Sequence, residues 1–345
     1  MYQYTLSLRD SAEWNRALPA SRSVFGSHAY LSIVADHHQC EPCLFGIEDL
    51  SSSIVYPFIL RSTKTLEFES NTEGFDSATP EFTGPIVTGN VATILRSAFR
   101  QVLHDEFNKR GVISEFAHLN PWADLDGILD AGIVYDRDIV WVDVSLPHEV
   151  LWRDHFSHAC RKNLNRSQRE NVRVFEGSKE EHIREFHRIY LHTMDRNQAN
   201  SSYYFGLDYF LAIFERLKSN ARFVLAEYRD QIVAATLYLH DSTNVYSYLG
   251  GADIAFQEVR PTNAVVLDTI NWARASGKVR LVLGGGYQPG DGIFRFKSSF
   301  SPYRVPFFTY RHIHLPEAYC TLEKLWAERY ACPNLGYFPS YRYRP

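Results

Sequence analysis

LVLGGGYQPGDGIFRFKSSF, the stretch from Leu281 to Phe300, joins a short apolar strand, a glycine-rich turn and a cationic segment. Leu281–Leu283 has the apolar character of a buried strand. Gly284–Gly286 lets the backbone turn sharply and leaves room for a ligand against bare main chain. Pro289-Gly290 and Asp291-Gly292 add further turn signals. We therefore expect a strand that ends in a loop that a ligand can approach.

The segment that follows these turns, Phe294–Lys297, alternates aromatic and basic side chains. In a strand, this period of two places the aromatic rings on one face and the positive charges on the other. A cationic, aromatic pocket next to a glycine turn is suited to a phosphorylated substrate. An ordinary strand-loop-strand with a solvated basic edge explains the same residues equally well, so both interpretations stay open at this point.

Length and composition limit the class of protein. The chain has 345 residues, 45% of them apolar and 22% charged, which is typical of a globular protein, and its length predicts two domains. The formal net charge is -4, so no global field favours nucleic acid, and DNA is not an expected partner. Any basic binding site must be local.

Cysteine usage and hydropathy point to a cytosolic protein with reduced cysteines. The five cysteines form no disulfide framework, and the CxxC spacing of Cys40 and Cys43 has no second CxxC to complete a zinc site. No run approaches the ~20 apolar residues of a membrane span, and the N-terminal residues lack the apolar segment of a signal peptide. We expect at most peripheral membrane contact.

The pattern of elements starts again near Pro147. The second half predicts a helix over Glu149–Arg169, further helices, a hairpin over Arg222–His240, a strand over Val245–Leu249, a helix from Pro261 to Gly277, and the strand of the opening stretch. This order resembles the core of the Gcn5-related N-acetyltransferase (GNAT) superfamily, in which two central strands splay apart and hold the acyl donor in the wedge.

Three motifs narrow the resemblance: RKNLNRSQRENVRVF (161–175), YLHTMDR (190–196) and FRFKSSF (294–300). Together they resemble the Fem-type branch, which includes the aminoacyltransferases that build peptidoglycan cross-bridges. The resemblance implies an α/β (α+β) fold with two tandem GNAT-like domains, each a mixed, mostly antiparallel sheet flanked by helices. We expect an N-terminal domain over 1–145, completed by 317–345, and a C-terminal domain over 146–316.

The resemblance also implies functional residues. The Phe-Lys pair at Phe296 and Lys297 corresponds to a pair in the Fem-type substrate channel whose lysine stabilises developing negative charge, so we expect a catalytic role. Basic residues that hold the acceptor's phosphates match Arg161, Lys162 and Arg166 by position. The full set of expected substrate-binding residues is Arg161, Lys162, Arg166, Arg196, Arg295, Tyr248, Gly285 and Gly286.

One departure concerns the donor. GNAT enzymes bind the pyrophosphate of CoA through a glycine-containing loop at the start of a helix, where backbone N–H groups face the anion. The matching segment, Gly250–Asn263, lacks that signature. No tightly bound cofactor is expected, and the acyl donor is a co-substrate, either aminoacyl-tRNA or acyl-CoA.

No residue stands out as a general base; Asp291, Glu227 and Tyr248 lie near predicted strand ends and are all weak candidates. His312 and His314 share one face of a predicted strand, but the sequence offers no evident third ligand, so no metal site is predicted.

Three functions remain open. The first is acyl or aminoacyl transfer to an amine of a cell-envelope precursor, a sugar nucleotide or muropeptide, with tRNA as a possible donor carrier. The second is an acyl-CoA-dependent N-acyltransferase that acts on an amino sugar in surface-polysaccharide biosynthesis. The third, from another class, is a non-catalytic protein that binds a phosphorylated glycan carrier.

Overall fold

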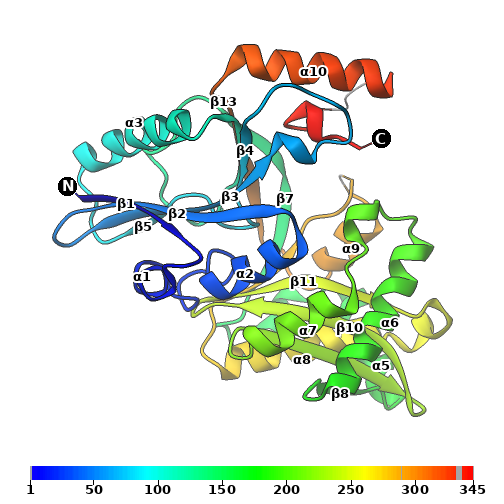
Figure 1. Ribbon diagram of the computed structural model, residues 1–345. Coiled ribbons are helices and arrows are strands. Elements are labelled where there is room, and N and C mark those ends of the chain that lie inside the picture. The colour runs from blue at the N-terminus through cyan, green and yellow to red at the C-terminus, as the bar shows by residue number, and fades with distance from the viewer. Residues whose placement is uncertain (1, 289, 332–335, 345) are drawn as a thin grey trace. The chain divides into compact units, whose positions relative to one another are not determined.

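A computed structural model describes residues 2–288, 290–331 and 336–344, and its chain divides into two units. Unit 1 comprises residues 1–136 and 306–345, and unit 2 comprises residues 137–305. The boundaries between the units fall inside two strands. The sequence pattern places them near residues 145 and 316, because Pro147 and Pro316 signal the starts of helices and not the strands that precede those helices. Figure 1 labels the elements along the chain.

Unit 1 is a mixed sheet with helices on both faces. Its elements are β1 (Tyr2–Ser7), α1 (Ser11–Ala17), α2 (His28–His37), β2 (Cys40–Glu48), β3 (Ser53–Ser62), β4 (Phe75–Ala78), β5 (Ile86–Thr88), α3 (Thr93–Lys109), β6 (Val112–His118), β13 (Arg304–Ile313) and α10 (Pro316–Tyr330). The apolar stripe of α3 packs on one face of β2, β3 and β6, and α10 packs against Ile113 on the other.

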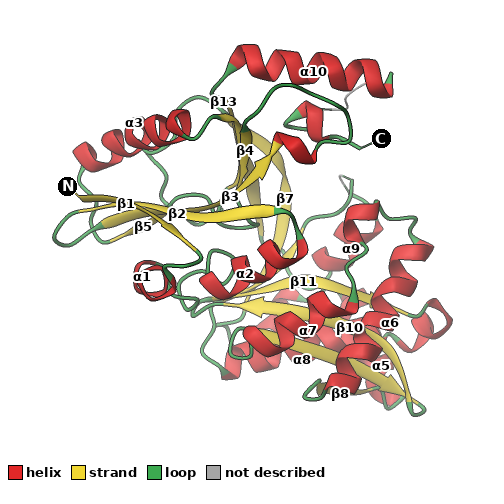
Figure 2. Ribbon diagram, viewed as in Figure 1, coloured by secondary structure: helices red, strands yellow, loops and turns green. Residues whose placement is uncertain are grey.

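Unit 2 repeats this construction, as Figure 2 shows. Its elements are β7 (Ile133–Asp143), α4 (His148–Val150), a π-helix (Leu151–His155), α5 (His158–Arg169), β8 (Arg173–Glu176), α6 (Glu180–Arg196), α7 (Leu207–Arg216), β9 (Ala221–Tyr228), β10 (Gln231–His240), β11 (Asn244–Ala252), a 3₁₀ helix (Ile254–Val259), α8 (Pro261–Ala275), β12 (Arg280–Gly284) and α9 (Gly292–Ser298). Apolar residues of α5 and α8 share one core with alternate positions of the strands.

The two units have the same strand order. Unit 1 runs β1-β2-β3-β4-β6-β13 and unit 2 runs β8-β9-β10-β11-β12-β7. In each, the first four strands are antiparallel, the fourth and fifth are parallel, and the sixth is antiparallel to the fifth. A helix, α3 or α8, connects the parallel pair, as a parallel connection requires. The prediction of two tandem GNAT-like domains, each a mixed and mostly antiparallel sheet, is confirmed.

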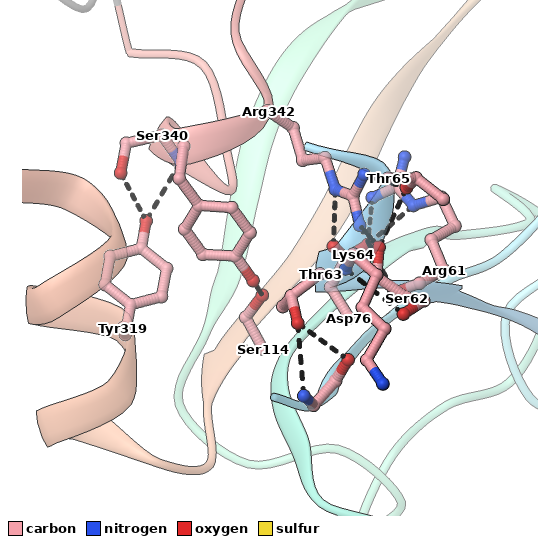
Figure 3. Close-up of polar contacts among 12 residues, drawn as sticks. Arg61, Ser62, Thr63, Lys64, Thr65, Asp76, Ser114, Tyr319, Ser340 and Arg342 are labelled. Carbon is pink, nitrogen blue, oxygen red and sulfur yellow. Dashed lines mark hydrogen bonds and ion pairs between the residues drawn. The ribbon is translucent and has the colours of Figure 1, made fainter. Parts of the chain in front are cut away.

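The C-terminal residues are fixed to unit 1 by a buried ionic cluster (Figure 3). Asp76 is fully buried and accepts hydrogen bonds from Arg342 Nε at 2.7 Å and from Arg61 Nε at 2.5 Å. Arg342 also donates to the carbonyl oxygen of Ser62 and to the hydroxyl of Thr65. These bonds tie the chain end to β3 and β4. Among the described residues, no helix is long and apolar enough to cross a membrane.

One half-buried histidine predicts a pH-dependent stability for unit 2. His240 on β10 packs 5.0 Å from the ring of Trp272, and burial, aided by Lys278 and Arg222, lowers its pKa from 6.5 to about 4. Between pH 4 and pH 6.5, His240 therefore binds a proton more readily in the unfolded chain than in the folded chain. We expect unfolding free energy to fall by about 2 kcal/mol, after allowance for solvent screening, as pH drops from 6.5 to 4.

The test compares thermal midpoints from pH 7.5 to pH 4 for the wild type, His240→Phe and His192→Phe, a control at an exposed helical position. His240→Phe should lose part of the acid sensitivity and His192→Phe should keep it. Identical pH profiles for all three proteins would contradict the assignment.

Candidate active site

β11 and β12 run side by side in parallel for a short distance and then separate. The ladder pairs Asn244 with Arg280 and Tyr246 with Val282. Beyond Tyr246, β11 continues to Ala252 with β10 as its partner, while β12 bonds to β7 along its other edge. Backbone polar groups on the two diverging edges are not joined to each other and can bond to an extended ligand. The predicted wedge between two central strands is present.

The helix α9 takes the place of the strand predicted for Phe294–Lys297. Asp291 caps this helix: its carboxylate accepts the N–H of Phe294 at 2.7 Å and that of Tyr287 at 2.7 Å. The N–H of Phe294, followed by those of Gln288 and Tyr287, holds the pKa of Asp291 below its ordinary value. The strand prediction was wrong because alternation over four residues is too short to outweigh an N-cap. The carboxylate of Asp291 is engaged in capping, so it is a poor general base.

Phe296 and Lys297, the predicted catalytic pair, make different contacts. The ring of Phe296 lies edge-on to Phe300, with 5.4 Å between centroids, and packs on the core of unit 2. The Nζ of Lys297 donates to the carbonyl oxygen of Gly285 at 2.7 Å. Phe296 thus anchors the helix, and the half-buried ammonium of Lys297 is held at the end of β12, where the strands separate.

The glycines at the end of β12 and just after it allow other parts of the chain to come close to the backbone. Gly284 has a φ of 80°, which favours glycine. A Cβ on Gly285 would stand 2.7 Å from Arg137 Cδ, and one on Gly286 would stand 2.5 Å from a carboxylate oxygen of Asp291. The ligand space predicted beside Gly285 and Gly286 is therefore occupied by the protein's own side chains. Arg137 also donates to the carbonyl oxygen of Gly286 at 3.0 Å, a role that sequence reasoning missed.

Arg196 and Tyr248 lie on the β11 side of the wedge. Arg196 Nη1 donates to the carbonyl oxygen of Ala252 at 2.8 Å, and the N–H of Ala252 donates to the Thr193 hydroxyl at 3.1 Å. The hydroxyl of Tyr248 hydrogen-bonds to that of Tyr209 at 2.8 Å. These contacts attach α6 and α7 to the diverging part of β11. Both predicted residues therefore border the wedge.

Gly251 allows α6 to approach β11 this closely. A Cβ at this position would stand 2.3 Å from Thr193 Oγ1 and 2.7 Å from the carbonyl oxygen of Ile189. We expect Gly251→Ala to lower the free energy of unfolding by about 1–3 kcal/mol, because the backbone must move. Urea unfolding measures this change. Gly292→Ala, where a Cβ meets no atom within 4 Å, is the matched control and should change stability by less than about 0.5 kcal/mol.

A basic cavity lies along α5. Its volume is about 830 Å³, and its lining residues are Trp152, His158, Arg161, Lys162, Asn165, Gln168 and Arg169. Arg161 Nη1 donates to the carbonyl oxygens of Trp152 at 3.0 Å and of Phe156 at 2.5 Å, so this guanidinium is positioned by backbone. Within the part of the chain that the structure describes, no carboxylate pairs with Lys162 or Arg169. The cavity can accept an anion.

The helix predicted over Glu149–Arg169 is interrupted. It turns into a π-helix at Leu151–His155 and ends at Phe156, and α5 starts anew with the Ser157 hydroxyl accepting the N–H of Cys160 at 3.1 Å. A serine cap decides the boundary that apolar periodicity could not show. The N–H of Ser157 donates to the carbonyl oxygen of Ser299 at 2.9 Å. The start of α5 therefore adjoins the end of α9, which brings the two predicted motifs together.

A second cavity of about 480 Å³ lies on the neighbouring face of α5 and is lined by Ala159, Lys162, Asn163, Arg166, Arg169, Glu170 and Arg260. Arg166 Nη2 stands 3.7 Å from a carboxylate oxygen of Glu258. Arg260 precedes α8 with a φ of 60°, and its buried Nε has no hydrogen-bond partner among the described residues. Sequence reasoning missed Arg260 because it looked for glycines at the start of this helix.

The remaining predicted residue, Arg295, is exposed on α9 and donates to the carbonyl oxygen of Gly290 at 3.0 Å. Glu227, one of the weak candidates for a general base, stands 3.5 Å from Arg173 Nε at the strand edge of unit 2. Neither the basic cavity nor the wedge contains it.

Comparisons with known proteins agree with this geometry. Residues 157–298 match the family model described as an acetyltransferase (GNAT) domain. FemX has a similar structure, with a TM-score of 0.72 and 10% sequence identity over 93% of this chain and 99% of FemX. A conserved protein of unknown function from Bacteroides thetaiotaomicron gives a TM-score of 0.59 and 14% identity over 89% of this chain and 97% of its own.

No curated protein matches the sequence. The family match includes α5, the diverging strands and Lys297, and the likeness to FemX extends the shared fold over both units. Residues 157–298 are thus similar to a GNAT acetyltransferase domain, and both units share the fold of FemX.

Proposed function

We propose that this protein transfers an acyl or aminoacyl group to an amine of a cell-envelope precursor, a sugar nucleotide or muropeptide, in the bacterial cytoplasm. The observation that carries the proposal is the ammonium of Lys297, held 2.7 Å from the Gly285 carbonyl oxygen where β11 and β12 separate. The fold shared with FemX and the Fem-type motifs around Arg161 and Lys297 support the same reaction class.

The chemistry requires a stabilised oxyanion and a route for one proton. The acceptor amine attacks the carbonyl carbon of the donor, and the negative charge that develops on the carbonyl oxygen is stabilised by a fixed cation in a partly dry site. Lys297 supplies that cation in our proposal. The C–N bond forms in this attack, the donor's C–S or C–O bond then breaks, and the proton lost by the amine passes to the leaving thiolate or alkoxide.

The basic cavity on α5 is the proposed site for the acceptor's phosphates. Its volume of about 830 Å³ falls in the range of small-molecule sites, and Lys162 and Arg169 offer charges that no carboxylate of the described chain neutralises. The contact between Ser157 and Ser299 joins this cavity's helix to the helix of Lys297. An acceptor held by its phosphates on α5 would thus be bound next to the catalytic helix.

A second candidate, an acyl-CoA-dependent N-acyltransferase acting on an amino sugar, is favoured by Arg260. This residue places a guanidinium at the start of α8, the position at which GNAT enzymes hold the CoA pyrophosphate, and it lines the second cavity together with Lys162 and Arg166. The guanidinium of Arg260 would then bind the pyrophosphate in place of the glycine-containing loop that this sequence lacks.

The test measures transfer with purified protein, a panel of aminoacyl-tRNAs and acyl-CoAs, and UDP-linked amino sugars or muropeptides as acceptors. Thermal midpoints with each compound identify the ligands first, because a ligand that binds the native state raises the midpoint. Product formation from aminoacyl-tRNA supports the first candidate. Absence of transfer from every donor, with a midpoint shift from a phosphorylated glycan alone, would favour a non-catalytic binding protein.

The variant Arg260→Gln separates the two donors. With acyl-CoA as donor, it should lower the affinity for CoA by about tenfold or more, since one charge-assisted contact to a phosphate is lost. With aminoacyl-tRNA as donor, CoA should give no midpoint shift in the wild type either. A CoA shift that Arg260→Gln retains in full would contradict the role given to Arg260.

A further inference from the structure

Three histidines meet in unit 1, whereas the acyltransferase motifs belong to unit 2. His104 comes from α3, His312 from β13 and His314 from the residue that follows that strand, and their ring nitrogens lie within 4.8 Å of one another. Strand alternation places His312 and His314 on one face, and their rings are 4.6 Å apart. The helix α3 covers this face and supplies the third histidine, which the sequence alone could not pair with the other two.

Glu115 fixes the orientation of His314. The His314 Nε2 stands 3.0 Å from a carboxylate oxygen of Glu115, which is fully buried. Glu115 also accepts bonds from both terminal nitrogens of Arg100 and from the hydroxyl of Tyr56, so it is held as a carboxylate. A carboxylate can only accept, so Nε2 carries the hydrogen of this bond, and Nδ1 is the ring nitrogen left to face the other histidines. A carboxylate behind a histidine is the usual outer support of a metal-binding imidazole.

The Nδ1 of His314 faces a second nitrogen. His314 Nδ1 and His104 Nδ1 are 3.0 Å apart. Two imidazole nitrogens that each bind one zinc ion at 2.0–2.1 Å in tetrahedral geometry stand about 3.3 Å apart. Without an ion this contact is a hydrogen bond between the two rings, and a movement of about 0.3 Å would give the spacing of two ligands of one ion.

His312 is the third histidine and lies on the more exposed side of the cluster. Its side chain is 27% exposed, whereas that of His314 is 0% exposed, so the His312 ring has room to turn toward an ion between the other two. The carboxylate of Asp130 stands 4.0 Å from His312 Nδ1 and, with Glu115, offsets the positive charge of Arg100. The open side leaves a coordination position for solvent.

We propose that His104, His312 and His314 bind one divalent transition-metal ion of the zinc class, with Glu115 as the positioning residue behind His314. Imidazole nitrogens suit zinc, cobalt and nickel better than magnesium or calcium. The ion would connect α3 to β13, the last strand of the unit 1 sheet, and so stabilise unit 1. This site is separate from the proposed transfer reaction, which uses residues of unit 2.

The experiment titrates chelator-treated full-length protein with Co²⁺ and Zn²⁺. Calorimetry counts bound ions, and the visible absorption of Co²⁺ reports its coordination. The expected result is one ion per chain and a higher thermal midpoint with the metal than without it. His312→Ala and His104→Ala should each lower the affinity by more than the roughly 10–100-fold that loss of an outer-shell partner costs, and Glu115→Gln should cause a loss within that range.

His192→Ala, on an exposed helical position of unit 2, is the matched control and should bind one ion as the wild type does. His312→Ala keeps the test valid if other variants fail to fold, because this side chain is partly exposed and its removal leaves the Glu115 cluster intact. The proposal is overturned if the wild type binds no ion, or if His312→Ala and His104→Ala bind as tightly as His192→Ala.

Discussion

Replacing Lys297 with methionine is expected to lower kcat for acyl transfer by about 10²–10³-fold, the usual cost of removing one group that stabilises an oxyanion. Methionine keeps most of the length and apolar stem of lysine but carries no charge. The Nζ of Lys297 is held by the Gly285 carbonyl oxygen, so the cation is in place before substrate binds. The measurement is the initial rate at saturating donor and acceptor, with KM determined for each.

Two observations distinguish a catalytic loss from a structural one. Lys218→Met, a control at an exposed position of unit 2, should leave kcat within about twofold of the wild type. The thermal midpoint of Lys297→Met should stay close to the wild-type value, because a hydrogen bond from a half-buried side chain to a backbone carbonyl contributes only about 1 kcal/mol. A raised KM with kcat unchanged would assign Lys297 to substrate binding and contradict a role in stabilising the transition state.

Strong periodic patterns made much of the fold predictable. The hairpin of β9 and β10, the strand β11, the helix α8 with Pro261 at its start, and the strand β12 all lie where apolar periodicity and turn residues placed them. Short segments were less predictable, because a cap decides them: Asp291 made a helix of Phe294–Lys297, and Ser157 divided a predicted helix. These hydrogen bonds depend on one side chain and leave no periodic signal.

The candidate site was predictable to a smaller extent. The motifs singled out Lys297 and Arg161, which lie on two adjoining helices, but not Arg137, which bonds to Gly286 across 149 positions of sequence. The histidine cluster shows the same limit, since His104 and His314 are 210 positions apart. Alternation in one strand reveals which side chains share a face. It does not reveal which helix covers that face.

Asp76→Ala is expected to be among the most destabilising substitutions in unit 1, at about 3–5 kcal/mol, because it leaves two guanidinium groups without their shared carboxylate. The side chain of Asp76 is 0% exposed and that of Arg342 is 12% exposed. Figure 3 shows the two side chains facing each other. Removing one partner of a buried pair leaves an uncompensated charge, so the double variant Asp76→Ala/Arg342→Met should be less destabilised than the sum of the single variants.

Urea unfolding measures these changes, and Trp326 reports on the C-terminal segment, since its indole N–H donates to the carbonyl oxygen of Tyr343 at 2.8 Å. The neighbouring pair of Lys64 and Glu73 is the control: its side chains are 69% and 75% exposed, so Lys64→Ala should cost at most about 1 kcal/mol. If Asp76→Ala unfolded at the same urea concentration as Lys64→Ala, the buried cluster would not be what fixes the chain end, and the apolar contacts of α10 with Ile113 would have to do so alone.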